Sequence, residues 1–188
     1  MPRLFVALDL PEDVKRSLEP LARGLGDVRW LLPEQQHLTL RFIGDLDNGR
    51  MYDVAEALAL VAGVPFELRL NGLGHFPPRG EPHVLWVGAE KSAELARLKR
   101  RIDRALEQAG LPLETRKFSP HVSIARIRGP LAPVRLGTYL MRHSLYQSKP
   151  FAVSSFQLYS SWLKPQGAEY QIEARYELVP GVDEHGFG

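Results

Sequence analysis

A short histidine motif occurs twice in this chain of 188 residues. His37-Leu38-Thr39-Leu40 and His121-Val122-Ser123-Ile124 each read histidine, apolar, hydroxyl, apolar, and they begin 84 positions apart. Successive side chains of a β-strand point to opposite faces, so this order puts a histidine and a hydroxyl on one face and two apolar side chains on the other. Each motif therefore predicts a strand with one buried face and one face that carries chemistry.

The sequence around the motifs is also repeated. A strand-like run at 4–8 recurs at 85–89, and a Pro-Phe pair opens a further apolar run in each copy. The order strand, helix, histidine strand, helix, Pro-Phe strand thus occurs twice, over about 3–74 and about 83–160. A repeat of this length is too long for a solenoid and predicts two similar lobes about a pseudo-twofold axis. Such an axis would bring the two histidine strands face to face.

Hydrophobic periodicity and turn residues predict the elements between the motifs. Strands are expected at 3–9, 36–43, 66–74, 83–88, 121–127, 150–159 and 169–178. Helices are expected at 12–25, 51–61, 92–109 and 131–145, and Pro20 should shorten or kink the first of them. This pattern indicates an α+β fold, in which two mixed or antiparallel sheets flank a central cleft with helices on the outside. We expect one domain over 1–188, with a flexible tail at 180–188.

Composition narrows the classes of function. The chain has no cysteine, which excludes disulfides, thiolate nucleophiles and Cys-ligated metals, and fits a reducing compartment. Its net charge of +2 is too small for a non-specific DNA coat, so any nucleic acid would be held at a local site. The chain has no apolar run long enough to span a membrane and starts directly with a strand-like run. We expect a cytoplasmic monomer without membrane contact.

Two histidines suit acid-base chemistry at phosphorus. An unperturbed imidazole titrates at about pH 6.5, so one ring can accept a proton while the other donates one. Thr39 and Ser123 would hold the non-bridging oxygens of the phosphate together with an arginine. No metal or other cofactor is expected, because no carboxylate stands at a ligand spacing beside either motif. The competing interpretation, two half-buried structural histidines, is less favoured because the motif is duplicated in matching contexts.

Four segments resemble one known family. They are the opening stretch 3–11, the first motif with its continuation to Gly44, the turn at 72–77 and the second motif over 120–126. Together they are similar to the 2H phosphoesterase superfamily, and within it to the 2′-5′ RNA ligase-like branch of RNA 2′,3′-cyclic phosphodiesterases. The resemblance covers nearly the whole chain. The family usually has threonine where this chain has Ser123, a change that keeps the hydroxyl but loses the methyl group that stiffens χ1.

The resemblance implies a fold, a reaction and roles for residues. It implies a bilobal pseudo-symmetric fold and metal-free opening of a 2′,3′-cyclic phosphate on RNA to a 2′-phosphate. His37 would be the acid to the leaving 3′ oxygen, and His121 the base that activates water. ATP-independent 2′-5′ ligation at the same site, or an RNA-end binding module without catalysis, remains an alternative. The sequence does not choose among these, nor does it identify the natural RNA or any nucleotide dependence.

The phosphate-binding arginine has two candidates. The resemblance points to Arg126, yet strict alternation from His121 would put residue 126 on the opposite face of its strand. Arg41 shares the parity of His37 and Thr39. Either a bulge near residue 125 turns Arg126 toward the site, or Arg41 is the main phosphate ligand.

Aromatic residues could stack on the bases of a bound RNA. Phe5, Phe76 and Trp162 are the candidates. Ordinary core packing is the competing interpretation for each of them.

Overall fold

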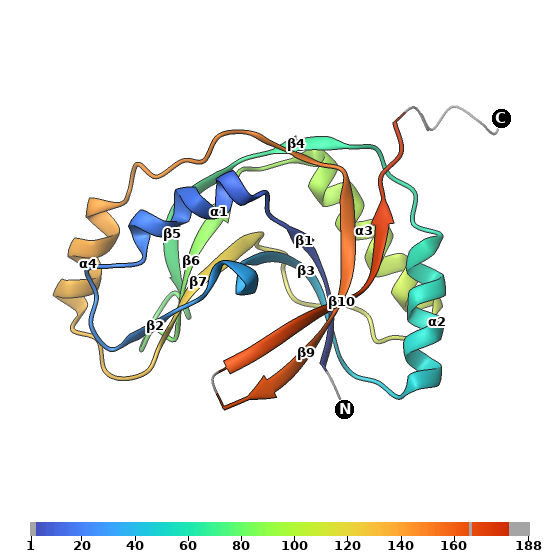
Figure 1. The fold of residues 1–188 in the computed structure, drawn as a ribbon, viewed down its shortest axis with the longest axis horizontal. Coiled ribbons are helices and arrows are strands. Elements are labelled where there is room, and N and C mark those ends of the chain that lie inside the picture. Colours follow the sequence, from blue (N-terminus) through green and yellow to red (C-terminus); the bar gives the residue numbers. More distant parts are fainter. Residues whose placement is uncertain (1–2, 166, 181–188) are drawn as a thin grey trace.

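The computed structural model describes residues 3–165 and 167–180, which form ten strands, four α-helices and two short 3₁₀ helices (Figure 1). The strands are β1 (Arg3–Asp9), β2 (Val28–Trp30), β3 (His37–Asp45), β4 (Phe66–Leu68), β5 (Leu70–Phe76), β6 (Val84–Ala89), β7 (His121–Ile127), β8 (Phe151–Val153), β9 (Ser155–Lys164) and β10 (Gly167–Glu177). The α-helices are α1 (Glu12–Leu18), α2 (Asn48–Ala59), α3 (Ala93–Gln108) and α4 (Pro133–Arg142). The 3₁₀ helices are η1 (Glu19–Leu21) and η2 (Pro33–Gln35).

The predicted elements are present, with three differences. The first helix ends at Leu18 and continues as η1, which contains Pro20, because proline cannot donate the next helical hydrogen bond. Each predicted Pro-Phe strand is divided in two, into β4 and β5 and into β8 and β9. The short strand β2 was not predicted. Apart from Pro180, the tail expected at 180–188 lies outside the described residues.

All strand pairs are antiparallel, and the strands of the two repeats are exchanged between the lobes. The main sheet has the order β10-β9-β1-β3-β7-β6-β5, with β2 paired to β7, and β4 and β8 form a separate two-stranded sheet. We call β1, β3, β9 and β10 lobe one, and β2, β5, β6 and β7 lobe two. The last long strand of the first repeat, β5, pairs with β6 of the second, and β9 of the second repeat pairs with β1 of the first. Each lobe therefore contains strands from both repeats.

The lobes meet where the two histidine strands touch. β3 and β7 are joined by the pair Leu38–Val122, two residues that occupy the same position in the two repeats. The pseudo-twofold axis therefore passes through this pair. The predicted α+β class with pseudo-symmetric lobes is confirmed, and the joint makes the main strands of the two lobes one continuous sheet.

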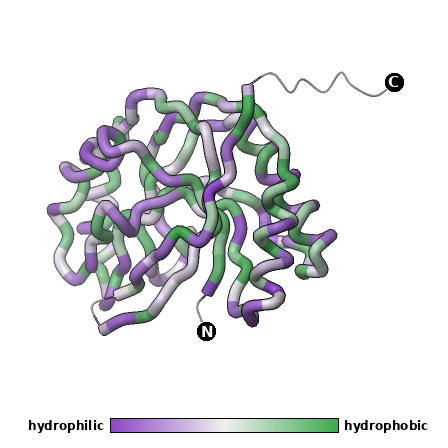
Figure 2. Tube along the Cα trace, turned by 45° about the vertical axis from the view of Figure 1, so that its right-hand side comes forward, coloured by the Kyte–Doolittle hydropathy of each residue, from purple (hydrophilic) through white to green (hydrophobic). Residues whose placement is uncertain are grey.

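One hydrophobic core extends through both lobes. Leu38 and Val122 are fully buried in it, and Figure 2 shows hydrophobic residues along the central strands. In Figure 1, α2 and α3 lie on the right, beside lobe one, and α1 and α4 lie on the left. The longest helix, α3, begins at its N-cap Ser92 and buries a stripe of Leu95, Leu98, Ile102 and Leu106.

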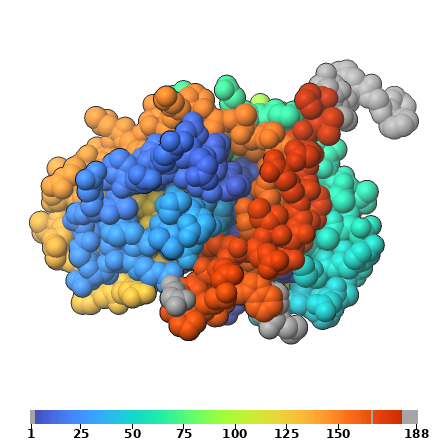
Figure 3. All heavy atoms as spheres, in the orientation of Figure 1, coloured from blue at the N-terminus to red at the C-terminus, as the bar shows by residue number. Residues whose placement is uncertain are grey.

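The hairpin of β9 and β10 packs against the segment that precedes β3. Figure 3 shows this segment, orange to red, crossing the front of the molecule between the blue N-terminal part and the teal α2. Near its tip, the Gln35 side chain donates a 2.7 Å hydrogen bond to the carbonyl of Ala168. None of the helices in the described ranges is long and apolar enough to cross a membrane.

Candidate active site

The two motif histidines share one face of the sheet. Leu38 and Val122 point into the core, so alternation along β3 and β7 turns His37 and His121 to the opposite face. In the antiparallel register set by Leu38–Val122, the two histidines are diagonal neighbours across the joint. Thr39 and Ser123 lie on the same face and, like both histidines, are half-buried. The structure thus brings together the four motif residues that the sequence singled out.

Three aromatic rings surround His37. Phe5 stacks on its imidazole with ring centroids 4.8 Å apart, and Tyr159 lies 5.8 Å away in a similar plane. Tyr170 meets the imidazole edge-on at 5.0 Å. The ring also hydrogen-bonds the backbone of Gln35. These contacts restrict the imidazole to one orientation, which general acid-base chemistry needs.

His121 is held in an equivalent way. Its Nδ1 lies 2.7 Å from the carbonyl oxygen of Ser119, which corresponds in the second repeat to Gln35 in the first. The edge of Phe76 packs against the ring with centroids 4.9 Å apart, and Trp86 lies at 6.1 Å. An Nδ1–H bonded to the carbonyl leaves Nε2 unprotonated in the neutral ring, with a lone pair available to a substrate.

Burial favours the neutral form of both histidines. It lowers the pKa of His37 to about 4, an effect that the Asp9 carboxylate opposes and that Lys15 and His121 reinforce. Burial also lowers the pKa of His121, with the Ser119 carbonyl opposing and the Arg126 guanidinium reinforcing the shift. The charge of each histidine therefore depends on what binds beside it, because a bound anion favours the protonated form.

An ion pair that the sequence did not single out adjoins His37. Lys15 Nζ lies 3.0 Å from Asp9 Oδ1, and only 9% of the Lys15 side chain is exposed. Asp9 is the register partner of His37 in the pairing of β1 with β3. Alternation along β1 could have identified Asp9 from the sequence, because Asp9 shares with Phe5 and Ala7 the face of the strand that lies toward the histidines.

A bulge in β7 turns Arg126 toward the site. Leu85 pairs with Ala125 and Trp86 with Ser123, so Ile124 is an extra residue that reverses the alternation beyond it. Arg126 is exposed on the face of His121 and near enough for its charge to lower the histidine pKa. The bulge is one of the two possibilities that the sequence left open.

The matching bulge in β3 turns Arg41 away. Val6 pairs with Arg41 and Ala7 with Thr39, so Leu40 is the extra residue. Arg41 is only 5% exposed, and its Nη1 lies 3.0 Å from Asp103 Oδ1 in α3. The prediction that Arg41 shares the face of His37 is therefore wrong, because strict alternation does not hold across the bulge.

The three stacking candidates are placed differently from one another. Phe5 is 3% exposed beneath His37, so it has no free face for a base. Phe76 is half-buried against His121. The Trp162 indole donates a 3.2 Å hydrogen bond to Ser160, whose side chain alternates with Tyr159, so Trp162 points away from the site. The prediction of base stacking is wrong for Phe5 and Trp162.

Phe42 is an exposed aromatic residue that the sequence reasoning missed. The bulge at Leu40 puts it on the face of His37, with its ring 6.2 Å from that of Phe5 and 68% of the residue exposed. Phe42 occupies the position in lobe one that Arg126 occupies in lobe two. The two residues are 84 positions apart, and each lies two residues after the bulge in its own strand. The sequence pattern could not identify Phe42 as a site residue, because its face depends on the bulge.

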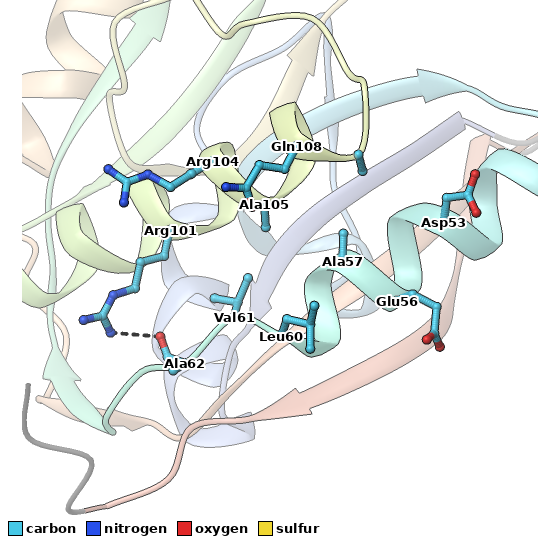
Figure 4. Close-up of a pocket in the computed structure, with 11 residues that line it drawn as sticks. Asp53, Glu56, Ala57, Leu60, Val61, Ala62, Arg101, Arg104, Ala105 and Gln108 are labelled. Carbon is cyan, nitrogen blue, oxygen red and sulfur yellow. Dashed lines mark hydrogen bonds between the residues drawn. The ribbon is translucent and has the colours of Figure 1, made fainter. Parts of the chain in front are cut away.

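The described residues show no metal-ligand cluster, and the hollow between α2 and α3 is separate from this site. Within residues 3–165 and 167–180, no group of three or more His, Asp or Glu side chains is arranged to hold a metal ion. Figure 4 shows a hollow of about 660 Å³ between α2 and α3, with Asp53 and Glu56 on one wall and Arg101 and Arg104 on the other. No residue of the two motifs lines it.

A lobed antiparallel sheet with a histidine on each strand of its central joint is the architecture of the 2H phosphoesterases. The chain belongs to the 2′-5′ RNA ligase superfamily, whose family model matches residues 10–161. The family expected from the paired motifs is thereby confirmed.

Two curated relatives are proteins named RNA 2′,3′-cyclic phosphodiesterase. The one from Thermotoga maritima is 32% identical over 184 residues, which cover 93% of this chain and 96% of that protein. The one from Thermus thermophilus is 31% identical over an alignment of 198 positions, which covers 98% of this chain and 92% of the relative.

Solved structures show the same fold. A crystal structure of a protein from Thermus thermophilus matches with a TM-score of 0.78 and 28% identity, over 94% of this chain and 97% of that one. Escherichia coli LigT complexed with 3′-AMP matches with a TM-score of 0.76 over 95% of this chain and 99% of its own. At 22% identity, this second similarity shows the fold alone.

Proposed function

We propose that this protein opens 2′,3′-cyclic phosphate ends of RNA to 2′-phosphates, with His37 and His121 as an acid-base pair and without a metal ion. The observation that carries the proposal is that two imidazoles, each oriented by a backbone contact and packed against aromatic rings, lie diagonally on one face of the sheet. The names of the curated relatives support the substrate.

The proposed reaction is an in-line displacement at phosphorus. Neutral His121 takes a proton from water through Nε2, and the water oxygen forms a new bond to phosphorus. The bond between phosphorus and the 3′ oxygen breaks, and protonated His37 gives its proton to that oxygen, which leaves a 2′-phosphate and a 3′-hydroxyl. Thr39, Ser123 and Arg126 hold the non-bridging oxygens, where negative charge accumulates.

His37 must be charged to act as the acid. Burial favours its neutral form in the free protein, whereas Asp9 and the negative charge of a bound phosphate favour the protonated form. Substrate binding thus raises the pKa of His37 and favours its protonated form, which can act as the acid. We further propose that the protein works as a monomer, because both imidazoles come from one chain. The absence of cysteine supports a reducing compartment such as the cytoplasm as its location.

The test is incubation of a short RNA ending in 2′,3′-cyclic phosphate with purified protein and a chelator, followed by separation of 2′-phosphate, 3′-phosphate and joined products. We expect the 2′-phosphate, and a loss of about 10²- to 10⁴-fold in rate for His37→Ala and for His121→Ala. Binding without turnover would indicate an RNA-end binding module and would overturn the proposal.

Ligation is the second candidate, and the name of the matching family favours it. The same acid-base pair can serve a 5′-hydroxyl nucleophile in place of water. Adding an RNA with a free 5′-hydroxyl to the assay, without ATP, tests this. Joined product at a rate comparable to hydrolysis would favour ligation.

A further inference from the structure

Two arginines lie directly opposite each other beside His121. Arg29 of β2 is the register partner of Arg126 of β7. Like charges in directly opposed positions destabilise a pair of strands, because their side chains stand close together on one face. Neither guanidinium forms an ion pair with a carboxylate within residues 3–165 and 167–180. The arrangement costs stability in the free protein and favours the binding of anions.

The Arg29 guanidinium packs against Gly167 and donates no hydrogen bond to an acceptor within residues 3–165 and 167–180. It lies against the backbone of Gly167, where a Cβ atom would overlap Nη2 and lie 2.7 Å from Cζ. Gly167 has a φ of +129°, which a residue with a side chain rarely adopts. The hairpin of lobe one therefore packs closely against Arg29. The guanidinium forms no hydrogen bond within the described part of the chain. A guanidinium whose donors are not used by the described part of the protein is available to an anion.

Tyr170 connects this arginine pair with the histidines. Its ring stands edge-on to His37, and the positive charges of Arg126 and Arg29 both act to lower its pKa against the raising effect of burial. Arg126 in turn acts on His121. Arg126 thus acts on both His121 and Tyr170, so the arginine pair lies beside the two histidines.

We propose that Arg29 binds the phosphodiester that precedes the terminal cyclic phosphate, so that the site recognises two successive phosphates of an RNA chain. This inference rests on the proposed function. Arg126 takes the reacting phosphate beside His121, and Arg29 takes its neighbour in the chain. Two adjacent phosphates neutralise the two opposed guanidinium groups. The protein then prefers an oligonucleotide end to a cyclic mononucleotide, which has only one phosphate.

The experiment compares two substrates and three variants. The substrates are adenosine 2′,3′-cyclic phosphate, with one phosphate, and the dinucleotide ApA ending in 2′,3′-cyclic phosphate, with two. Arg29→Met keeps the aliphatic stem and removes the charge. Arg126→Met removes the proposed ligand of the reacting phosphate. Arg128→Met, an exposed arginine just beyond β7, is the matched control for charge.

We expect the wild type to have a lower KM for the dinucleotide than for the mononucleotide. Arg29→Met should raise the dinucleotide KM about tenfold or more and leave both constants for the mononucleotide within about twofold of wild type. It should also reduce the dependence of log KM on log salt concentration by about 0.7, the value for one phosphate contact on a single strand. Arg126→Met should impair both substrates, and Arg128→Met neither.

Other outcomes separate this inference from the proposed function. Equal losses on both substrates in Arg29→Met, or no preference of the wild type for the dinucleotide, would overturn the second phosphate site while the reaction stands. A melting temperature for each variant shows whether a loosened hairpin, rather than a lost phosphate contact, explains an equal loss. If the wild type turns over neither substrate, the proposed function has failed. In that case the dinucleotide Kd still tests the second phosphate site, and equal Kd values for wild type and Arg29→Met would overturn that site as well.

Discussion

Leu38 packs opposite Val122 at the joint between the lobes, and the two residues are the same position of a duplicated sequence. Each is followed and preceded along its strand by site residues, so the pair determines how the two histidines are placed relative to each other. The stability of the site therefore depends on two fully buried aliphatic side chains that do not take part in the chemistry.

Truncation of Leu38 should destabilise the whole protein. Leu38→Ala removes a fully buried side chain from the joint and should lower the free energy of unfolding by about 2–5 kcal/mol, because it leaves a cavity. Denaturant unfolding measures the change. Leu60→Ala is the control, since Leu60 is 85% exposed, and it should stay within about 0.5 kcal/mol of wild type. Equal stability of the two variants would contradict the role of the joint.

Acidification should destabilise the protein through His37. Its pKa is lowered from 6.5 to about 4 in the folded state, so the unfolded chain takes up the proton first as the pH falls. The stabilisation is complete above about pH 6.5 and is lost as the pH falls toward 4, by about 3 kcal/mol in all. The lowered pKa of His121 acts in the same direction.

Unfolding free energies between pH 7 and pH 4 check this expectation. His37→Gln should flatten the curve in that window, whereas His83→Gln, at an exposed position, should leave its shape unchanged. Parallel curves for wild type and His37→Gln would show that the buried imidazole is not the source of the pH dependence.

Gly74 makes room for Trp86 beside His121. A Cβ atom at Gly74 would overlap Cζ2 and Cη2 of the indole and lie 2.8 Å from Cε2. Gly74→Ala should therefore displace Trp86, reduce the rate of turnover and cost about 1–3 kcal/mol of stability. Gly129→Ala is the matched control, because a Cβ there meets nothing within 4 Å. If Gly74→Ala retains the activity and stability of the control, the packing of Trp86 does not support His121.

The two arginine candidates should separate stability from activity. Arg41→Met breaks the ion pair with Asp103 and should cost about 2 kcal/mol or more, with kcat for the remaining folded protein unchanged. Arg126→Met should lower the rate by about tenfold or more and leave stability within about 0.5 kcal/mol. The reverse pattern would restore Arg41 as the phosphate ligand. Thermal unfolding and steady-state kinetics on the same preparations distinguish the two results.

The duplicated motif predicts a large part of this molecule from sequence, because period-2 alternation holds over the short stretches 37–40 and 121–124. It placed both histidines and both hydroxyls on one face. It failed for Arg41 and did not single out Phe42, since a β-bulge depends on how neighbouring strands pair and leaves no mark in the hydrophobic pattern of its own strand.

Other features depend on contacts between distant segments. The three residues of β2 are too few to show a period, and they form a strand only because β7 offers an edge. Arg29 was missed for that reason. The approach of Gly167 to Arg29 follows from the reach of a hairpin and could not be read from either segment alone.

The crossing of β5 and β9 between the lobes has a consequence for how the protein acquires its activity. A nascent chain that has left the ribosome only as far as β5 lacks the partners of both its outer strands, β6 for one and β9 for the other. His37 is then present without Tyr159 and Tyr170, which pack against it in the complete fold, and His121 has not yet been made. Catalytic competence and completion of the fold are thus acquired together, once β9 has been made, and neither repeat contains a complete site by itself.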